Sequence, residues 1–430
     1  MIQLRNGTFI DWQTLEFRQA DILINSGVNG LLSLTDIPSS GFPGDAGETG
    51  IKVDKVIDCT GKFITKSFAN GHHHVYSALA CGMPAPKVNP TNFIEILRYI
   101  WWNIDKALDL DMIRASALVT AMACARSGVT FVVDHHASPF APGGSLDAIA
   151  SAFDEVGIGH LLCYEISDRD GTEIAGKGLA ETTHYLSEHQ GLVGLHASFT
   201  VGENTLKQAV KLASGTNSGI HIHVAEDISD QEHCINRYGR RVVERLSDAG
   251  VLQFPKTILA HCLHLDDHER GLVEGSPAWV VENMESNLNN SVGFFNSKGL
   301  GSRIMFGTDG MHSDMLRSAR AAFFAGHNFD AIDYGETYRR LRNVHRYLES
   351  NRFAGDGDNN LVVFGYDPPT PFNRDNFLGH LLFGLESGHI THVISQGRLI
   401  LDEGRIVTVD EKSILSGARA QAERLWQRLC

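Results

Sequence analysis

Eight short apolar runs rich in β-branched residues alternate with amphipathic helical patterns along the middle of the chain. One such pattern, residues 145–157, places Leu146, Ile149, Phe153 and Val156 on a single stripe. Strands that alternate with helices form a parallel sheet, and eight such units close a (β/α)8 barrel. We therefore expect an α/β protein with a TIM barrel. The eight runs are residues 63–71, 128–134, 158–166, 191–199, 219–226, 256–262, 278–283 and 303–309.

Both ends of the chain show short alternating segments separated by Gly, Pro and Asp, which is typical of β-strands and turns. Within them, residues 41–50 read as a turn-rich loop, and residues 397–407 predict a hairpin that turns at Asp402–Gly404. Two β-rich ends around a different middle predict one small β-sandwich domain built from both termini. The expected division is 1–61 for the first part of the β-sandwich, 62–355 for the barrel, 356–410 for the second part of the β-sandwich and 411–430 for a C-terminal helix.

The long connection after the first barrel run contains residues 91–109, which predict an extra helix over the barrel mouth. The chain has 430 residues and a formal net charge of −14, which argues against nucleic-acid and membrane-surface partners, because these need basic patches. The seven cysteines are scattered without a C-x-x-C motif, as in proteins of reducing compartments. No basic leader or long apolar run occurs, so we expect a cytoplasmic protein with a small-molecule partner.

Polar residues of the types that bind metals stand at the C-terminal ends of four barrel runs. The ends carry His72–His74, His223 followed by Glu226, His261, and Asp309. Active sites of (β/α)8 barrels lie at this rim. A core role would require buried histidines and an aspartate with no common purpose, so the pattern predicts a metal site.

The three consecutive histidines can be separated by the period of a strand. Alternate side chains of a strand share a face, so His72 and His74 point together into the barrel and His73 points away. We interpret His72 and His74 as metal ligands and His73 as structural.

The other rim residues each have an ordinary alternative. His221 and His223 share a face, and His223 is nearer the strand end, which favours it over His221 as a ligand. Glu226 can reach over the site as a proton carrier or stay a solvated loop residue. His261 reads equally well as a satisfied buried histidine, and Asp309 as a turn residue.

The order and spacing of these motifs resemble the amidohydrolase superfamily, in its mononuclear cytosine-deaminase and chlorohydrolase-like branch. The matching pieces are GKFITKSFANGHHH, GLHASFTV, HIHVAED, TILAHCLHL, ENMESNLNN and FGTDG, and the stretch ISQGRLILDEGRI matches the family's composite β domain. Within that branch, DHHASP, the pair Trp101–Trp102 and SNLNNSVG are most similar to the selenium-metabolism aminohydrolases of the SsnA type.

The resemblance implies a set of roles for individual residues. Glu226, His261 and Asp309 would be catalytic, and His196 would lie near the substrate. The fourth barrel run lacks the lysine that bridges two metals in dinuclear relatives, which favours one ion. The metal ligands would be His72, His74, His223 and Asp309.

Three imidazoles and a carboxylate suit Zn²⁺, with Fe²⁺ as a chemically reasonable alternative. Our hypothesis is that hydroxide formed on this ion attacks an sp² carbon that carries an amino group. Asp309 takes the proton of the water, His261 steadies the hydroxide, and Glu226 protonates a ring nitrogen and assists the departure of ammonia. The substrate suggested by the relatives is a nitrogen heterocycle or a cyclic amidine.

Groups that bind the substrate should come from the long first connection and from the ends of further strands. For the tryptophan pair core packing is the stronger reading, and Arg169 reads as a surface loop charge. The candidates are Trp101 or Trp102, His135 or His136, His196 and Asn287, among which we select Trp102, His136, His196 and Asn287.

The chain departs from the family pattern at three points. Lys66 and Ser67 replace a common Pro-Gly, Glu282 replaces a common histidine on the seventh strand, and His73 is an additional histidine. We expect the first to concern the backbone and the second to alter the pocket, because residues of the seventh strand face it.

Two other readings remain open. The enzyme could hydrolyse another bond, such as C–Cl or amide C–N, which a test for ammonia distinguishes. The chain could also be a non-catalytic scaffold, although such relatives usually lose ligands. Relatives often form dimers, and by analogy with them a homodimer is the expected partner state.

Overall fold

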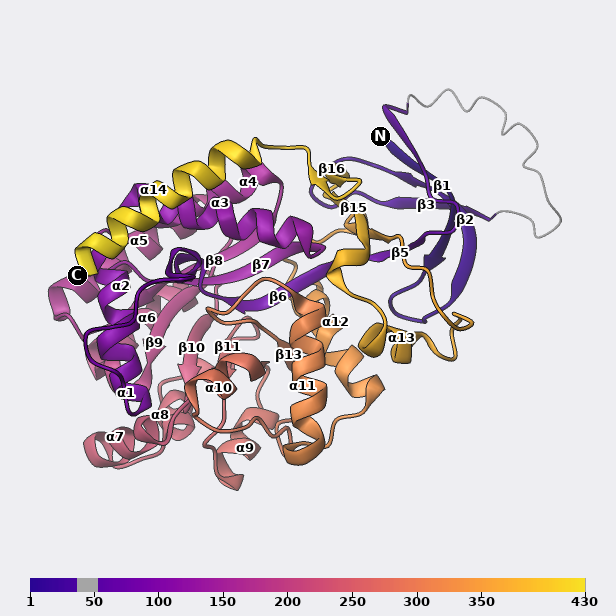
Figure 1. The fold of residues 1–430 in the computed structure, drawn as a ribbon. Coiled ribbons are helices and arrows are strands. Elements are labelled where there is room, and N and C mark those ends of the chain that lie inside the picture. Colours follow the sequence, from indigo (N-terminus) through magenta and orange to yellow (C-terminus); the bar gives the residue numbers. More distant parts are fainter. Residues whose placement is uncertain (37–52, 430) are drawn as a thin grey trace.

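The computed structural model describes residues 1–36 and 53–429, so the predicted turn-rich loop at 41–50 and Cys430 lie outside the described residues. The described residues form two sheets, one in a helix-wrapped barrel and one beside it (Figure 1). Among the described helices none is long and apolar enough to span a bilayer.

The barrel consists of eight parallel strands arranged in chain order. Thr308 and Asp309 donate backbone N–H groups to the carbonyl of His72, which joins the last strand to the first. The (β/α)8 prediction is therefore confirmed, and each predicted run supplies one strand. The strands are β6 (Phe68–His73), β7 (Val129–His136), β8 (Gly159–Ile166), β9 (Val193–Ala197), β10 (Ile220–Val224), β11 (Ile258–His261), β12 (Trp279–Glu282) and β13 (Ile304–Phe306).

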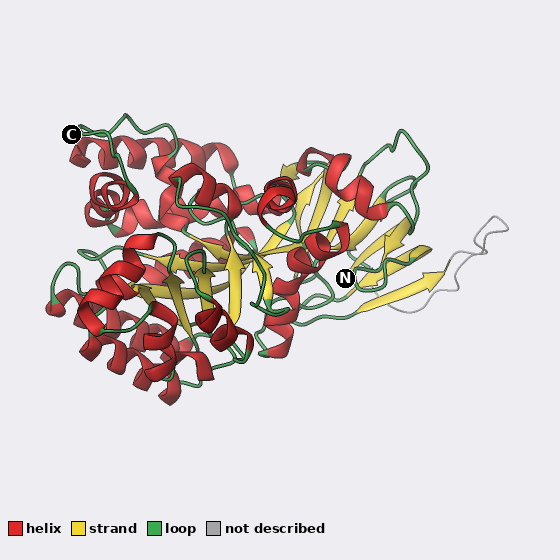
Figure 2. Cartoon of the chain, turned by 90° about the horizontal axis from the view of Figure 1, so that it is seen from below, coloured by secondary structure: helices red, strands yellow, loops and turns green. Residues whose placement is uncertain are grey.

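The helices surround the barrel strands (Figure 2). In α4 the residues of the predicted stripe, Leu146, Ile149, Phe153 and Val156, are all buried, and burial of such a stripe is the main source of helix stability. The helices of this layer are α3 (Leu110–Arg126), α4 (Ser145–Val156), α5 (Thr172–Glu188), α6 (Glu203–Gly215), α7 (Ile228–Tyr238), α8 (Val242–Asp248), α9 (Asp267–Glu274), α10 (Met284–Asn290), α11 (Met315–Phe329) and α12 (Tyr334–Ser350).

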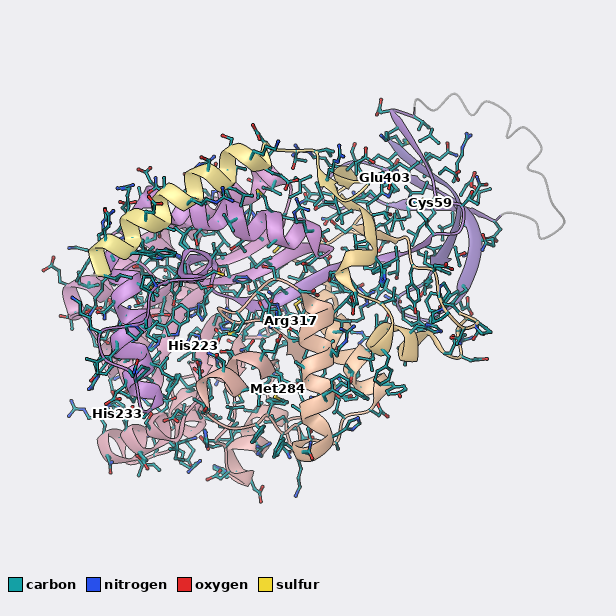
Figure 3. All side chains as sticks on the ribbon, in the orientation of Figure 1. Cys59, His223, His233, Met284, Arg317 and Glu403 are labelled. Carbon is teal, nitrogen blue, oxygen red and sulfur yellow. The ribbon has the colours of Figure 1, made fainter. Side chains whose placement is uncertain are left out.

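The second sheet has nine strands and takes them from both ends of the chain. Lys62 of the N-terminal part pairs with Glu403 of the C-terminal part at 3.1 Å, and Figure 3 shows Cys59 beside Glu403. The predicted hairpin is confirmed, since Asp402 pairs with Arg405 around Glu403 and Gly404, both with positive φ. The strands are β1 (Ile2–Ile10), β2 (Phe17–Ile24), β3 (Leu32–Asp36), β4 (Lys55–Asp58), β5 (Phe63–Lys66), β14 (Leu361–Phe364), β15 (Ile390–Ser395), β16 (Arg398–Asp402) and β17 (Arg405–Ile406).

The chain passes from this sheet to the barrel at Ser67, which divides the first predicted run into β5 and β6. Lys66, expected to matter only for the backbone, has a buried side chain that contacts Asp356 at 3.1 Å. Arg342 of α12 donates to the carbonyl of Ser67 at 2.6 Å. Ser67 Oγ lies 2.6 Å from Thr130 Oγ1 of β7, so the departure from Pro-Gly adds side-chain contacts at the junction of the two sheets.

The remaining helices include the predicted one after the first barrel strand and the predicted C-terminal one. Trp426 of α14 donates its indole N–H to the carbonyl of Leu79, which ties the end of the chain to the barrel mouth. These helices are α1 (Phe93–Ile96), the π-helical segment η2 (Leu97–Trp101), α2 (Trp102–Ala107), α13 (Phe377–Phe383) and α14 (Glu411–Leu429). Short 3-10 helices are η1 (Val75–Ala80), η3 (Ser198–Thr200), η4 (Val251–Gln253) and η5 (Ser387–His389).

Candidate active site

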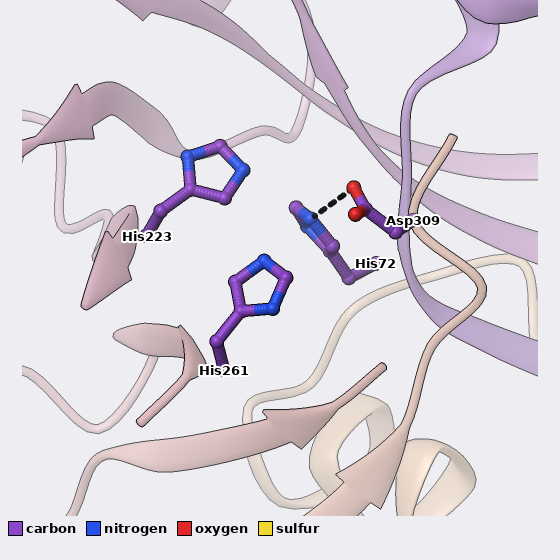
Figure 4. A group of neighbouring side chains, drawn as sticks. All are labelled: His72, His223, His261 and Asp309. Atoms are coloured by element: carbon purple, nitrogen blue, oxygen red, sulfur yellow. Dashed lines mark ion pairs between the residues drawn. The ribbon is translucent and has the colours of Figure 1, made fainter. Parts of the chain in front are cut away.

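Residues from four barrel strands meet at the C-terminal rim. His72, His223, His261 and Asp309 each offer one ligand atom, and these atoms all lie within 4.8 Å of one another (Figure 4). His261 and Asp309 have φ values of 72° and 53°, a left-handed conformation that is uncommon outside glycine. Such outliers concentrate at functional sites, where surrounding contacts hold them.

His74 belongs to the same group. Its Nε2 lies 2.9 Å from Asp309 Oδ1 and 3.1 Å from His223 Nε2, and His72 Nε2 lies 3.4 Å from Asp309 Oδ1. Four ligand atoms around a tetrahedral zinc ion with bonds of 2.0–2.1 Å are about 3.3 Å apart. The observed spacings fit a single ion of this kind.

The histidines of the cluster are oriented from behind through their Nδ1 atoms. The Nε2 atoms of His72 and His261 are buried and make no hydrogen bond, which suits ligand or proton-transfer atoms. The contacts of Nδ1 are His72 with His221 Nε2 at 2.9 Å, His74 with the His135 carbonyl at 2.6 Å, His223 with the His196 carbonyl at 2.8 Å and His261 with Asn287 Oδ1 at 2.8 Å.

His73 points away from this cluster, as the strand alternation predicts. Its Nε2 contacts Ser313 Oγ at 3.1 Å. Burial lowers the pKa of His73 to about 3, so the imidazole is neutral at physiological pH. His221, which sequence reasoning ranked below His223, lies behind His72 and orients it.

Glu226 faces the cluster from the turn after β10. Its Oε2 lies 3.6 Å from His261 Nε2, and Asn290 donates to its Oε1 at 3.5 Å. Burial raises the pKa of Glu226 to about 7, opposed by the charge of His261. The carboxyl group can therefore hold and release a proton near neutral pH.

The pKa of Asp309 is shifted in the opposite direction from that of Glu226. Burial by itself would raise its pKa, but the imidazoles of His72 and His74, 3.4 and 2.9 Å from its Oδ1, hold the pKa well below its usual range. Ser286 of α10 also donates its hydroxyl to Asp309 Oδ2. The two carboxyl groups of the site thus differ in proton affinity, which is the arrangement of an acid–base pair.

A pocket that is open to solvent lies over the cluster. Of the predicted substrate residues, Trp102 and His196 line it, with ring centroids 6.1 Å apart. His136 does not line it and contacts Ser138 Oγ at 3.0 Å. Asn287 also lies outside the lining and contacts His261 instead.

Two residues lie where the sequence did not predict them. Arg169, expected as a surface charge, is buried with 7% of its side chain exposed and lines the pocket. Glu282, expected to face the pocket, is buried in an ion pair with Arg340 of α12 at 2.7 Å. The alternation of β12 directs Glu282 outward, toward the helix layer.

Further polar residues of the pocket, among them Ser286, Asn290 and Glu165, were not singled out by their chemistry in the sequence. Ser286 and Asn290 come from the ESNLNN stretch, where positions four apart share one helix face. Glu165 ends β8 and also lines the pocket. Its position at the C-terminal end of a barrel strand is a signal that could have identified it.

Comparison with known proteins places the chain in a sequence family. Residues 63–352 match the family described as the amidohydrolase family. A 5-methylthioadenosine/S-adenosylhomocysteine deaminase of Thermoanaerobacter pseudethanolicus is 26% identical over 404 residues, which cover 88% of this chain and 90% of that protein.

Solved structures share the fold at lower identity. A zinc-bound adenosine deaminase from Xanthomonas campestris superimposes with a TM-score of 0.82 at 17% identity, covering 99% of this chain and 98% of the other. An atrazine chlorohydrolase from Arthrobacter aurescens, complexed with zinc, has a TM-score of 0.80 at 16% identity and covers 98% and 100%.

Proposed function

Because the chain belongs to the amidohydrolase family, we propose that it is a metal-dependent aminohydrolase that releases ammonia from a nitrogen heterocycle or a cyclic amidine. The observation that carries the proposal is the convergence of His72, His74, His223 and Asp309 beneath a pocket that also holds Glu226. The deaminase activity named for the similar Thermoanaerobacter protein supports the same reaction class.

The proposed ligands are His72, His74, His223 and Asp309, and Zn²⁺ is the ion that this set of three imidazoles and a carboxylate suits best. When bound, such an ion lowers the pKa of a coordinated water to about 7. The unbonded Nε2 atom of His72 and the spacing of the cluster support this choice.

The acid–base work falls to three residues of this chain. Asp309, with its depressed pKa, accepts the proton of the attacking water. His261, oriented by Asn287, donates a hydrogen bond to the developing oxyanion. Glu226 donates its proton to the ring nitrogen next to the reacting carbon. As the tetrahedral carbon collapses, Glu226 takes the proton of the new hydroxyl and Asp309 passes the proton of the water to the leaving amine, so ammonia departs and both carboxyl groups return to their starting states.

The proposal includes a location in the cytoplasm, which rests on the cysteines. Those in the described residues are all free thiols, and five of the six are buried. This pattern is typical of proteins in reducing compartments.

Ammonia release together with metal analysis tests the proposed function. The purified protein is expected to hold about one Zn²⁺ per chain and to release ammonia from at least one member of a panel of aminopurines, aminopteridines, aminopyrimidines and aminotriazines. Chelation should abolish the release, and added Zn²⁺ should restore it. Zinc-loaded protein that releases chloride from a chlorotriazine but no ammonia would refute deamination and favour the C–Cl alternative.

A further inference from the structure

Besides Glu226 and Asp309, a third carboxyl group, that of Glu165, lies in the pocket. Glu165 ends β8 and has only 3% of its side chain exposed. One of its oxygens lies within 4.8 Å of ring nitrogens of both His196 and His223. A substrate held over the metal cluster would therefore present one of its edges to Glu165.

The contacts that Glu165 makes within the described protein are long. His135 Nδ1 and Arg169 Nη1 both lie 3.5 Å from its oxygens, at the outer limit of a hydrogen bond. His135 Nδ1 is itself buried and has no hydrogen-bond partner. The carboxylate is nevertheless kept ionised, because His196, His135 and Arg169 outweigh its burial and lower its pKa well below the usual range.

The neighbouring Arg169 is already neutralised by other acids. It pairs with Asp105 and with Asp170, the latter at 3.2 Å, and its guanidinium lies 5.2 Å from the ring centroid of Trp102. Lys106 also pairs with Asp170, at 2.7 Å. Histidines apart, two cations (Arg169 and Lys106) face three carboxylates (Asp105, Asp170 and Glu165), so these two cations are fully paired and offer no free charge to an anionic ligand.

We propose that Glu165 is a specificity-determining residue that accepts hydrogen bonds from N–H donors of the substrate and selects a cationic amidinium or amino-substituted edge over a neutral one. This inference rests on the proposed function and names the kind of substrate that the pocket takes. A buried carboxylate with only long contacts gains most from a charged donor, since hydrogen bonds between ions are roughly twice as strong as neutral ones.

A matched pair of probes tests the inference without turnover. Benzamidine and benzamide have the same planar shape, but only benzamidine is a cation. With zinc-loaded protein and isothermal titration calorimetry, we expect the wild type to bind benzamidine more tightly than benzamide. Glu165→Gln should weaken the affinity for benzamidine about 10- to 100-fold and change the affinity for benzamide by no more than about threefold. The control Glu173→Gln, on the exposed face of α5, should leave both affinities unchanged.

Three results would overturn the inference. These are an unchanged affinity of Glu165→Gln for benzamidine, a wild type that does not prefer the cation, and loss of a second metal ion in the variant, which would make Glu165 a ligand with His196 and His223. If Glu165→Gln also lost its affinity for benzamide, the variant Glu165→Asp would decide between a disrupted pocket and a lost charge. Glu165→Asp keeps the charge and should therefore keep part of the preference for benzamidine over benzamide. The ammonia assay on the wild type tests the proposed function separately, so the proposed function and the role of Glu165 can be refuted independently of each other.

Discussion

At the scale of single residues, the pocket separates two carboxyl groups by their surroundings. Glu226 is buried and has only an amide and an imidazole as partners, so its pKa is raised to about 7 and its neutral form persists at mildly acidic pH. Asp309 is buried as well, but the adjacent imidazoles of His72 and His74 favour its anion. One group can therefore give a proton at the pH at which the other can take one.

Glu226→Gln should retain zinc and lose at least 100-fold in kcat, because a well-placed proton donor contributes about 10²–10⁴-fold. The measurement is ammonia release on the best substrate, with zinc content determined on the same sample. Glu232→Gln, on the exposed side of α7, is the matched control and should behave as wild type. Normal turnover by Glu226→Gln would show that Glu226 is not the proton donor.

At the scale of elements, neighbouring barrel strands come so close that some positions leave no space for a side chain. Gly194 of β9 lies against the backbone of Tyr164 in β8, and an added Cβ would overlap the Tyr164 carbonyl. Gly176 of α5 faces open space instead. The strand glycine is thus required by packing, whereas the helix glycine only costs conformational entropy.

Gly194→Ala should destabilise the protein by about 1–3 kcal/mol, since overpacking forces the backbone of a strand to shift. Gly176→Ala, the opposite member of the pair, should stabilise it by about 0.5–1 kcal/mol. Thermal unfolding followed by circular dichroism should give a lower midpoint for the first variant and a slightly higher one for the second. If Gly194→Ala had the same unfolding midpoint as the wild type, β8 and β9 would accommodate the added methyl group without loss of stability.

At the scale of the whole molecule, α12 holds the barrel and the terminal sheet together. His345 is buried there, with Nδ1 2.7 Å from Asp356 Oδ2 and Nε2 3.0 Å from the Ser67 carbonyl. Burial lowers the pKa of His345 below its ordinary value, against the opposing charge of Asp356, while Lys66 and Arg342 lower it further. The neutral imidazole is therefore favoured more strongly in the folded protein than in the unfolded chain.

This burial makes stability depend on pH in a defined direction. Below about pH 6.5 the unfolded chain binds a proton at His345, whereas the folded chain binds it only at a lower pH. The contribution of His345 is thus fully present above pH 6.5 and is lost as the pH falls toward the lowered pKa of the folded state. His345→Gln should reduce the drop in Tm between pH 7.5 and pH 5.5.

The exposed His268 provides the control for this measurement. His268→Gln should keep the full drop of the wild type, because its side chain is largely in solvent. A drop in His345→Gln as large as that of the wild type would show that other groups set the pH dependence.

The sequence by itself determined the barrel and the set of side chains at its rim. Strand and helix periods are local properties, and the C-terminal ends of parallel strands must meet at one rim. The rim residues His72, His223, His261 and Asp309 could therefore be placed at one end of the barrel without coordinates, and the alternation of β6 separated His73 from its neighbours.

Only the tertiary structure decided which other polar residues enter the pocket. Arg169 and Glu165 became pocket residues, and Glu282 turned toward Arg340 of α12. His136 and Asn287 found partners outside the lining. The orientation of each depends on a partner from a distant element. The free energy of a buried charge is set by that partner, so the local pattern of the sequence does not contain it.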